Sequence, residues 1–352
     1  MTSSIPTTMK AAVIEEGHKF SIKSHPVPPV GDNDILVKTV AVALNPTDWK
    51  HVDFTGIPGA IVGCDFSGTV VKVGSAVTNL SVGQQVAGFV HGSAFSDEGA
   101  FAEYVKTPAD LVWPIPEGAF SHEEAATIGC AFWTAAQALF HPTRLGLVEP
   151  PSKTDKEEWI FIYGGSSAVG QCAVRLAALA GYKVVATASP RNFDLVKSLG
   201  ASAVFDYRAP DVIDQIKAAT GGTLAKAVDT ISEKDSQRIC AESMGPAGGH
   251  VVLVLFRVPE ATQRTDVAFK TTLIYTSLGR EFTFAGTMHF PVSEEDRAHM
   301  VSFLEKVPEL VKSGAVKPLP IKAWEGGLDG LADGLQYMRE GKVSAEKIVY
   351  RL

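Results

Sequence analysis

A glycine-rich turn carries the clearest chemical signal in this chain. Gly164 and Gly165 directly follow the apolar segment WIFIY, and Gly170 opens the alanine-rich segment after it. Glycine lacks a Cβ, so it permits a tight turn and lets a diphosphate approach the backbone, while the N-terminus of the following helix offers unpaired N–H groups and a partial positive charge. The turn therefore predicts a dinucleotide site, although its G-G-x-x-x-x-G spacing departs from the usual G-x-G-x-x-G pattern.

The end of the next strand indicates which dinucleotide would bind. The segment KVVATA runs into Ser189, Pro190, Arg191 and Asn192, with no Asp or Glu at that point, where an NAD site would place an acid on the ribose hydroxyls. A hydroxyl, a guanidinium and an amide are donors suited to a 2′-phosphate. We therefore expect NADP(H), the alternative being that Arg191 is an exposed residue in the first turn of a helix. Tyr207, at the end of the strand after that, either contacts the adenine end of the cofactor or is a half-buried strand aromatic; the sequence favours neither.

The elements that must position these groups change along the chain. Before residue 120 the sequence reads as short β-strands separated by Gly, Pro, Asn and Asp, which is typical of a small barrel-like domain. Ser121 and Glu124 then form a capping box that opens a predicted helix through residue 140. Residues 141–158 are polar and proline-bearing and predict a loop. From residue 159, apolar strands alternate with helices, which predicts a doubly wound parallel sheet.

The last segment differs again. A helix capped by Ser293 and bent at Pro308 is expected, followed by strands at PLPIKAW and EKIVYRL that could rejoin the first domain. We therefore expect one discontinuous domain, residues 1–120 plus 286–352, with the nucleotide-binding domain inserted between them at residues 121–285.

Composition excludes several classes of protein. The 352 residues suggest two domains. A net charge of −7 disfavours a nucleic-acid or membrane binder. The four cysteines are scattered without a C-x-x-C pair, so neither a disulfide framework nor a four-cysteine zinc site is expected. The start MTSSIPTTMK lacks the apolar region of a secretion signal, and no apolar run is long enough to span a membrane. A cytoplasmic protein is the expectation.

Over nearly its whole length, the sequence resembles the medium-chain dehydrogenase/reductase superfamily. Segments that carry the likeness are MKAAVI, ALNPTDWK, PGAIVGCDFSGTVVKVGSAV, GAFAEYV, AATIGCAFWTAAQAL, YGGSSAVGQ and GKVSAEKIV. Zinc alcohol dehydrogenases of this superfamily carry Cys and Gly-His-Glu where this chain has Asn45 and Gly63-Cys64-Asp65, so the chain resembles the zinc-free branch of quinone and enoyl reductases and no metal is expected. SPRNFDLVKSLGA and VFDYR are most similar to fungal trans-acting enoyl reductases of polyketide pathways.

The resemblance implies an α/β fold, with a Rossmann domain inserted into a GroES-like β-barrel domain, and it implies site residues. Those near the cofactor would be Thr47, Asp48, Trp49 and Lys50 at the nicotinamide ribose; Gly165, Ser166, Ser167, Ala168 and Val169 at the diphosphate; Ser189, Pro190, Arg191, Asn192 and Tyr207 at the 2′-phosphate end; Val254 and Leu255 beside the nicotinamide; and Val343 and Ser344 closing over it. Those lining the substrate cleft would be Ala131, Phe132, Trp133, Thr134, Ala135, Ala136, Gln137, Ala138, Ile274, Tyr275, Thr276, Ser277 and Leu278.

The expected reaction is hydride transfer from NADPH to the C=C bond of a conjugated carbonyl or acyl thioester, followed by protonation of the α-carbon. Lys50 and Thr134 are the candidate catalytic residues, with Asn45 as a further polar candidate. Each has a plainer alternative: Lys50 as an exposed lysine, and Thr134 bonded back to its own helix. Tyr275 and water are both candidate proton donors.

Two other functions stay open: an NADPH:quinone oxidoreductase, and a protein that binds NADPH as a sensor without turnover. The substrate would be a small molecule or an acyl chain on a carrier, such as the carrier domain of a polyketide synthase. The protein would be a monomer or a homodimer.

Overall fold

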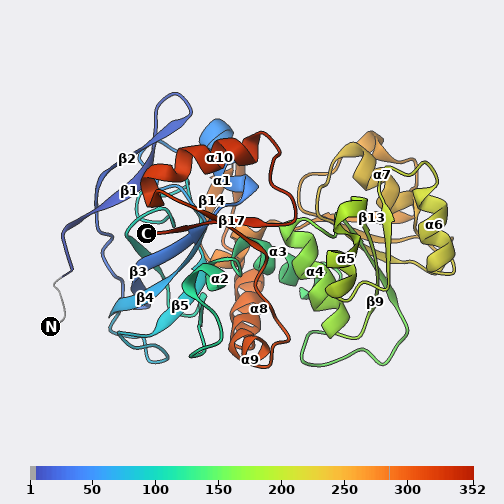
Figure 1. Ribbon diagram of the computed structural model, residues 1–352, viewed down its shortest axis with the longest axis horizontal. Helices are drawn as coiled ribbons and strands as arrows, with labels where there is room; N and C mark the ends of the chain where they lie inside the picture. The colour runs from blue at the N-terminus through green and yellow to red at the C-terminus, as the bar shows by residue number, and fades with distance from the viewer. Residues whose placement is uncertain (1–4, 285) are drawn as a thin grey trace. The chain divides into compact units, whose positions relative to one another are not determined.

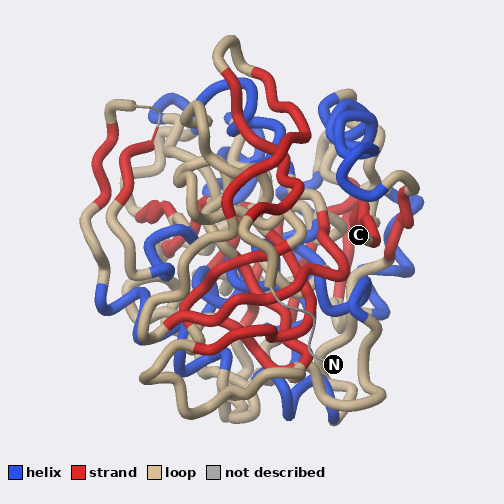
Figure 2. The backbone as a smooth tube through the Cα atoms, turned by 90° about the vertical axis from the view of Figure 1, so that its left-hand side faces the viewer, coloured by secondary structure: helices blue, strands red, loops and turns tan. Residues whose placement is uncertain are grey.

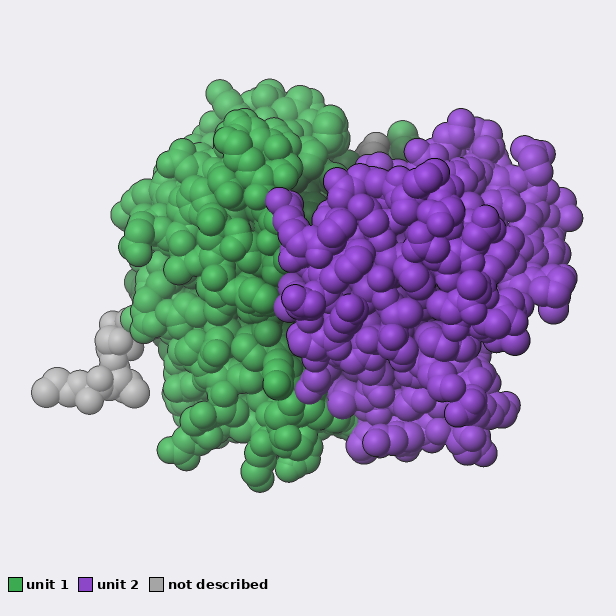
Figure 3. All heavy atoms as spheres, turned by 45° about the vertical axis from the view of Figure 1, so that its right-hand side comes forward, with its two compact units in different colours: residues 1–130, 275–352 green, residues 131–274 purple. Residues whose placement is uncertain are grey.

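A computed structural model describes residues 5–284 and 286–352 (Figure 1). The chain divides into two compact units: unit 1 is Met1–Cys130 with Tyr275–Leu352, and unit 2 is Ala131–Ile274 (Figure 3). The start of the chain, residues 1–4, and residue 285, where the inserted domain was expected to end, lie outside the described residues. Unit 2 begins at residue 131 instead of the expected residue 121, and it ends at residue 274 instead of the expected residue 285.

Unit 1 is built around a mixed sheet, drawn red toward the viewer in Figure 2, whose strand pairs are antiparallel except for the parallel pair of β16 and β17. The sheet has seven strands, in the order β16-β17-β3-β4-β5-β7, with β6 pairing β3 beside β17. Its elements are β1 (Thr8–Glu15), β2 (Lys19–Pro26), β3 (Asp34–Ala43), α1 (Pro46–Lys50), η1 (His51–Thr55), β4 (Asp65–Val73), β5 (Gln85–Phe89), β6 (Tyr104–Pro108), β7 (Val112–Pro114), α2 (His122–Ala126), η4 (Ile274–Leu278), β14 (Phe282–Phe284), β15 (Met288–Phe290), α8 (Glu294–Leu304), α9 (Val307–Lys312), β16 (Ile321–Trp324), η5 (Gly327–Gly330), α10 (Leu331–Arg339) and β17 (Lys347–Arg351).

The C-terminal strand completes this sheet. Val349, Tyr350 and Arg351 of β17 pair antiparallel with β3, so the last residues of the chain return to the domain that begins it. Pro308 stands in the first turn of a new helix, because the segment after Ser293 breaks into α8 and α9 instead of bending as one helix.

Unit 2 is a six-stranded parallel sheet with the strand order β10-β9-β8-β11-β12-β13. In order of appearance the strands run 3-2-1-4-5-6, the Rossmann arrangement, so the predicted fold class is confirmed. The elements are α3 (Cys130–Phe140, begun by the last residue of the first segment of unit 1), β8 (Trp159–Tyr163), α4 (Ala168–Leu179), β9 (Lys183–Ala188), η2 (Pro190–Asn192), α5 (Phe193–Ser198), β10 (Ala203–Asp206), α6 (Val212–Ala219), β11 (Lys226–Asp229), α7 (Lys234–Glu242), β12 (Gly249–Leu253), η3 (Pro259–Ala261) and β13 (Val267–Thr271).

The helix expected over residues 122–140 is interrupted, which explains the shifted unit boundary. α2 ends at Ala126, and α3 begins at Cys130. The hydroxyl of Ser67 in β4 donates to the carbonyl oxygen of His122 at 2.6 Å, so α2 is fastened to the sheet of unit 1. Within the described ranges, no helix is long and apolar enough to cross a membrane.

The predicted capping box is present and yields a test. The hydroxyl of Ser121 accepts from the backbone N–H of Glu124 at 3.2 Å, and the Glu124 carboxylate accepts from the N–H of Ser121 at 2.8 Å. We expect Ser121→Ala to lower the free energy of unfolding by about 1 kcal/mol, because it removes one partner of an otherwise unpaired helix N–H. Urea unfolding measures the difference, and an unchanged midpoint would contradict the cap's contribution.

Candidate active site

The glycine-rich turn of unit 2 joins β8 to α4 through a residue with positive φ and a close approach of two backbone segments, both of which favour glycine. Gly164 has a positive φ of 76°. A Cβ on Gly170 would lie 2.1 Å from the carbonyl oxygen of Gly164, so any side chain there would push the helix off the strand end. Both glycines therefore let the N-terminus of α4 lie directly against the end of the first strand of the sheet.

Side chains around the turn hold it in shape and leave backbone groups for a ligand. The hydroxyl of Ser167 accepts from the N–H of Gly170 at 2.9 Å and lies 2.9 Å from the hydroxyl of Thr230. The side chain of Ser167 thus caps the helix. The N–H groups of Ala168 and Val169 belong to the first turn, where a helix provides no internal acceptor. The expected diphosphate residues are therefore together at the positive end of a helix.

The end of β9 adjoins this turn. Thr187 of β9 accepts two hydrogen bonds from the turn. Its hydroxyl accepts from the N–H of Gly164 at 3.1 Å, and its carbonyl oxygen accepts from the N–H of Gly165 at 2.8 Å. After the strand, Ser189 leads into η2, where Arg191 is exposed and Asn192 half-buried. Asp194 is already in the first turn of α5. The absence of an acid at the strand end therefore holds within the described structure.

Tyr207 follows β10 at the same edge of the sheet and is 38% exposed. The guanidinium of Arg208 lies over its ring at 5.2 Å and also binds the carboxylate of Asp206, with Nε 3.0 Å from Oδ1. The side-chain hydrogen bond from Arg208 lowers the pKa of Asp206. Arg208 was not among the residues expected at the 2′-phosphate end. The available signal was an arginine directly after an aromatic residue at the end of a strand.

The expected nicotinamide neighbours come after β12. The N–H of Val254 donates to the hydroxyl of Ser232 at 2.9 Å. Leu255 is 41% exposed and Phe256 is 46% exposed. Since the carboxyl ends of parallel strands share one edge of the sheet, these apolar residues lie on the same edge as the glycine-rich turn.

The expected substrate-lining residues of α3 are nearly all buried. Ala131 and Phe132 are each 2% exposed, Thr134 is 6% exposed, and Trp133 and Ala135 through Ala138 are inaccessible. Gln137 is engaged inside unit 2, where its side-chain oxygen accepts from the hydroxyl of Thr272. Thr134 is thus the most exposed of these residues.

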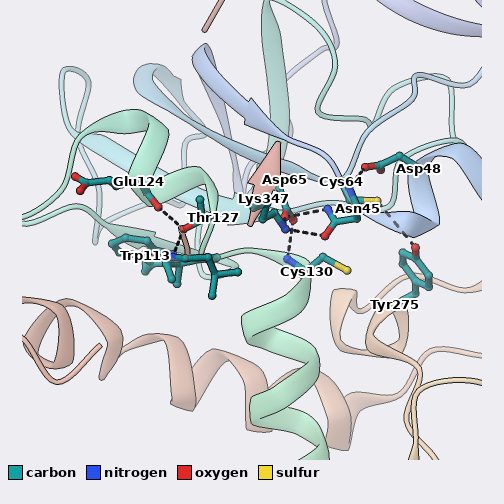
Figure 4. A network of polar contacts seen from close by, with 12 residues as sticks. Asn45, Asp48, Cys64, Asp65, Trp113, Glu124, Thr127, Cys130, Tyr275 and Lys347 are labelled. Carbon is teal, nitrogen blue, oxygen red and sulfur yellow. Dashed lines mark hydrogen bonds and ion pairs between the residues drawn. The ribbon is translucent and has the colours of Figure 1, made fainter. Parts of the chain in front are cut away.

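Unit 1 contains a buried polar centre, shown in Figure 4. The ammonium of Lys347 lies 2.6 Å from Oδ2 of Asp65 and 2.7 Å from Oδ1 of Asn45. The side-chain N–H of Asn45 donates to the same Asp65 oxygen at 2.9 Å. The side chains of Lys347 and Asp65 are 2% and 0% exposed. Nearby charges, chiefly Asp65, raise the pKa of Lys347 against the opposing effect of burial, so the lysine stays protonated.

The second oxygen of Asp65 fixes the start of α3. It accepts from the backbone N–H of Cys130 at 2.6 Å. A Cβ on Gly129 would lie 2.3 Å from this oxygen, so the carboxylate requires a glycine before the helix. The break between α2 and α3, which the sequence did not predict, therefore makes room for Asp65.

Asn45 and Asp48 cap α1 reciprocally. The carboxylate of Asp48 accepts from the N–H of Asn45 at 2.6 Å, and the side chain is inaccessible to solvent. Burial raises the pKa of Asp48 to about 7. Asp48 was expected at a cofactor ribose, but its carboxylate is turned inward to its own helix.

Trp49 and Lys50, the other end of α1, are half-buried. The Lys50 ammonium lies 5.7 Å from the centre of the Trp49 ring, and the Arg339 guanidinium lies 5.6 Å from it. Arg339 also forms a bidentate pair with Asp53 of η1, each distance being 2.8 Å. Lys50 is therefore held beside an aromatic face and does not extend freely into solvent.

The segment at 274–278 forms the 3-10 helix η4. Tyr275 enters the centre of unit 1, where its hydroxyl lies 2.6 Å from the hydroxyl of Thr47 and 4.0 Å from the sulfur of Cys64. Thr276 donates to the carboxylate of Asp296, and Ser277 and Leu278 are buried. Val343 packs against the main core of unit 1, followed by the half-buried Ser344.

Comparisons with known proteins agree with this architecture. A family model described as the alcohol dehydrogenase GroES-like domain matches residues 31–117, and one described as zinc-binding dehydrogenase matches residues 168–294. Trans-enoyl reductase ACTTS2 of Alternaria alternata is 40% identical over 98% of this chain and 99% of its own length. Trans-enoyl reductase caaB of Aspergillus niger is 40% identical over 99% of this chain and 98% of its own. A crystal structure of an alcohol dehydrogenase superfamily protein from Novosphingobium aromaticivorans, 22% identical, has a TM-score of 0.79 over 98% of this chain and 100% of that one; it shares the fold.

The residues of this chain do not fit the zinc that the second description names. Lys347 already supplies a positive charge between Asn45 and Asp65, and it would repel a metal ion placed there. Burial raises the pKa of the Cys64 thiol well above its usual value, which disfavours the thiolate that binds metals. Across residues 5–284 and 286–352, no group of three or more His, Cys, Asp or Glu side chains could hold a metal ion.

Removal of the Lys347 ammonium should strongly destabilise unit 1. We expect Lys347→Met to lower the free energy of unfolding by about 3–5 kcal/mol, because Asp65 is left as an uncompensated buried charge. Lys342→Met is the matched control, since Lys342 pairs with Glu340 at the surface. Denaturant unfolding measures both variants, and equal stability of the two would contradict the assignment.

The raised pKa of Asp48 predicts a pH dependence. Its folded pKa of about 7 exceeds its usual 3.8, so between these values the folded protein holds a proton that the unfolded chain lacks. This contribution to stability is therefore largest at low pH and is lost as the pH rises toward 7. Asp48→Asn keeps an acceptor for Asn45 and cannot ionise. As the pH rises from 5 to 8, the free energy of unfolding of the wild type should fall relative to that of Asp48→Asn. Parallel pH curves for the two proteins would contradict the prediction.

Proposed function

The chain belongs to the trans-enoyl reductase family of the medium-chain dehydrogenase/reductase superfamily, and we propose that it reduces the C=C bond of an enoyl thioester with NADPH. The expected superfamily is confirmed, and the protein is an oxidoreductase. The observation that supports the substrate class most directly is the 40% identity to named trans-enoyl reductases over 98% of the chain, which includes the segments that carry the candidate site residues.

The cofactor site is proposed on the carboxyl edge of the parallel sheet. Ser166 through Val169 would bind the diphosphate at the N-terminus of α4. Ser189, Arg191 and Asn192 would bind the 2′-phosphate, Arg191 being exposed at that strand end. Arg208 adds a second guanidinium one strand further along, beside the face of Tyr207. When bound, NADPH supplies the hydride that the β-carbon accepts.

The protein's own part is to orient the reactants and stabilise the charge that develops on the substrate. Thr47 and Lys50, on the capped helix α1, are proposed to hold the nicotinamide ribose, and Lys50 could also face the enolate oxygen. Thr134 is proposed to bind the nicotinamide amide. Val254, Leu255, Val343 and Ser344 would surround the nicotinamide. The start of α3, at Ala131 and Phe132, and the helix η4 would form an apolar boundary for the acyl chain, whereas Trp133 and Ala135 through Ala138 are inaccessible and would not line the cleft.

The delivery of substrate follows from the family name. An enzyme that works in trans receives its acyl chain from a separate protein, so we propose an acyl carrier domain of a polyketide synthase as the partner, met in the cytoplasm.

A substrate panel tests the proposal. NADPH oxidation should be followed with enoyl pantetheine thioesters, enoyl-carrier conjugates, quinones and saturated ketones. The proposal expects turnover of enoyl thioesters, fastest on the carrier. Turnover of quinones alone would identify a quinone oxidoreductase, and tight NADPH binding without turnover of any substrate would identify a sensor.

The choice of cofactor can be tested at Arg191. We expect Arg191→Ala to raise the KM for NADPH by about 10- to 100-fold, in keeping with the loss of a charge-assisted hydrogen bond, and to leave the KM for NADH unchanged. Arg238→Ala, an exposed arginine on α7, is the control. An equal effect on both cofactors would contradict a 2′-phosphate contact.

A further inference from the structure

Three side chains of unit 1 form a continuous chain of hydrogen bonds. The hydroxyl of Thr47 lies 2.6 Å from the hydroxyl of Tyr275 and 3.2 Å from Nε2 of His51. The other ring nitrogen of His51, Nδ1, lies 3.1 Å from the carbonyl oxygen of Gly92. Tyr275 and His51 are each only 4% exposed, so solvent does not compete for these contacts.

The direction of each hydrogen bond in the neutral chain follows from the groups at its ends. A carbonyl oxygen can only accept, so Nδ1 of His51 carries a proton and Nε2 of the neutral ring is an acceptor. The single hydroxyl proton of Thr47 therefore goes to Nε2. The short contact between Thr47 and Tyr275 then requires the Tyr275 hydroxyl as its donor.

Protonation of His51 reverses the chain. The imidazolium donates from Nε2 to the hydroxyl of Thr47, which turns to donate to Tyr275, and the phenolic proton of Tyr275 becomes available to another acceptor. Burial lowers the pKa of His51 to about 4. In the resting state at neutral pH, Tyr275 therefore donates to Thr47 and Thr47 donates to His51. The reverse direction arises when an anion nearby draws a proton onto the His51 ring.

Few other groups that titrate or carry charge face this chain. His91 stacks on Tyr275 with ring centres 3.9 Å apart, and burial lowers its pKa well below the usual value. Cys64 faces the Tyr275 hydroxyl, and Asp48 lies beyond it.

Two ion pairs near the chain are already satisfied. Asp53, on the same helix as His51, is bound by Arg339, and Arg280, which acts on His91, is bound by Asp97 and Glu98. The Tyr275–Thr47–His51 chain is thus bordered by a neutral histidine, the thiols of Cys64 and Cys130, the buried carboxyl of Asp48 and paired charges.

We propose that this chain supplies the proton that the α-carbon takes up after hydride transfer, with Tyr275 as the terminal donor; the inference rests on the proposed function. As the new C–H bond forms at the α-carbon, the O–H bond of Tyr275 breaks. The phenolate takes the hydroxyl proton of Thr47, and Thr47 takes the Nε2 proton of His51, which water had supplied by way of the half-buried hydroxyl of Thr47. The enolate gains one proton, water loses one, and the three side chains return to the neutral chain.

The remaining hydrogen-bonding capacity of Thr47 agrees with this role. A hydroxyl has one proton and two acceptor sites. In the resting chain its proton goes to His51 and one acceptor site goes to Tyr275. One acceptor site is left, which a ribose hydroxyl could fill without interrupting the chain. Thr47 can therefore serve both the cofactor and the proton path.

The test follows the α-carbon in deuterium oxide. An enoyl pantetheine thioester is reduced with NADPH, and the configuration of the deuterium at the α-carbon is determined by NMR. We expect a single configuration from the wild type. Tyr275→Phe should give both configurations and a kcat lower by about 100-fold or more, because water replaces a positioned acid. A single configuration from Tyr275→Phe would overturn the proposal.

Variants of Thr47 test the link. Thr47→Val should lower kcat by about 10-fold with little change in the KM for the thioester, because Tyr275 no longer receives a proton from His51. Thr47→Ser, which keeps the hydroxyl, should restore kcat. Thr39→Val is the control, because among the described residues the buried hydroxyl of Thr39 has no hydrogen-bond partner. Equal kcat in Thr47→Val and the wild type would overturn the link.

A measurement without turnover checks the direction. Nitrogen-15 NMR of His51 at neutral pH should show a proton on Nδ1 and none on Nε2; the opposite tautomer would overturn the assigned chain. A wild type that oxidises no NADPH with any enoyl thioester would instead reject the proposed function, so the two failures are distinguishable.

Discussion

The buried ion pair between Lys347 and Asp65 is the interaction on which unit 1 depends. It joins the last strand of the chain to the start of β4, across 282 residues. Through Asn45 it fixes the N-terminus of α1, and through the second oxygen of Asp65 it fixes the first residue of α3. A buried carboxylate is tolerated only when it is paired and fully hydrogen-bonded, and Lys347, Asn45 and Cys130 together meet that condition. The return of the C-terminal strand therefore brings an internal cation as well as a sheet neighbour.

The two units build their candidate sites by different means. In unit 2 the site is made of backbone: glycines bring a helix end against a strand end, and Ser167 and Thr187 hold that geometry. In unit 1 it is made of side chains whose charges are neutralised internally. Because Asp65 neutralises the charge of Lys347, the polar groups that we propose for the chemistry are the hydroxyls of Thr47 and Tyr275, the imidazole of His51 and the ammonium of Lys50. A reaction in which hydride comes from a cofactor and a proton from a side chain suits such a set.

Much of the fold was predictable because it is encoded in local patterns. The apolar strands, the glycine-rich turn and the Ser121–Glu124 cap each occupy a short segment with a direct physical meaning. The ion pair was not predictable, since nothing near Lys347 indicates a partner so far away in sequence. The break before α3 was missed because alanine-rich residues favour one long helix, and the need for Gly129 arises only from Asp65. The inward turn of Asp48 and the Tyr275–Thr47 contact likewise exist only in the folded unit.

The most direct test of the account is the fate of the hydride. NADPH carrying deuterium at the transferred position of C4 should be incubated with an enoyl thioester, and the product examined by mass spectrometry and NMR. We expect a saturated thioester with one deuterium, located at the β-carbon. Deuterium at a carbonyl carbon, or a saturated product without deuterium, would contradict it.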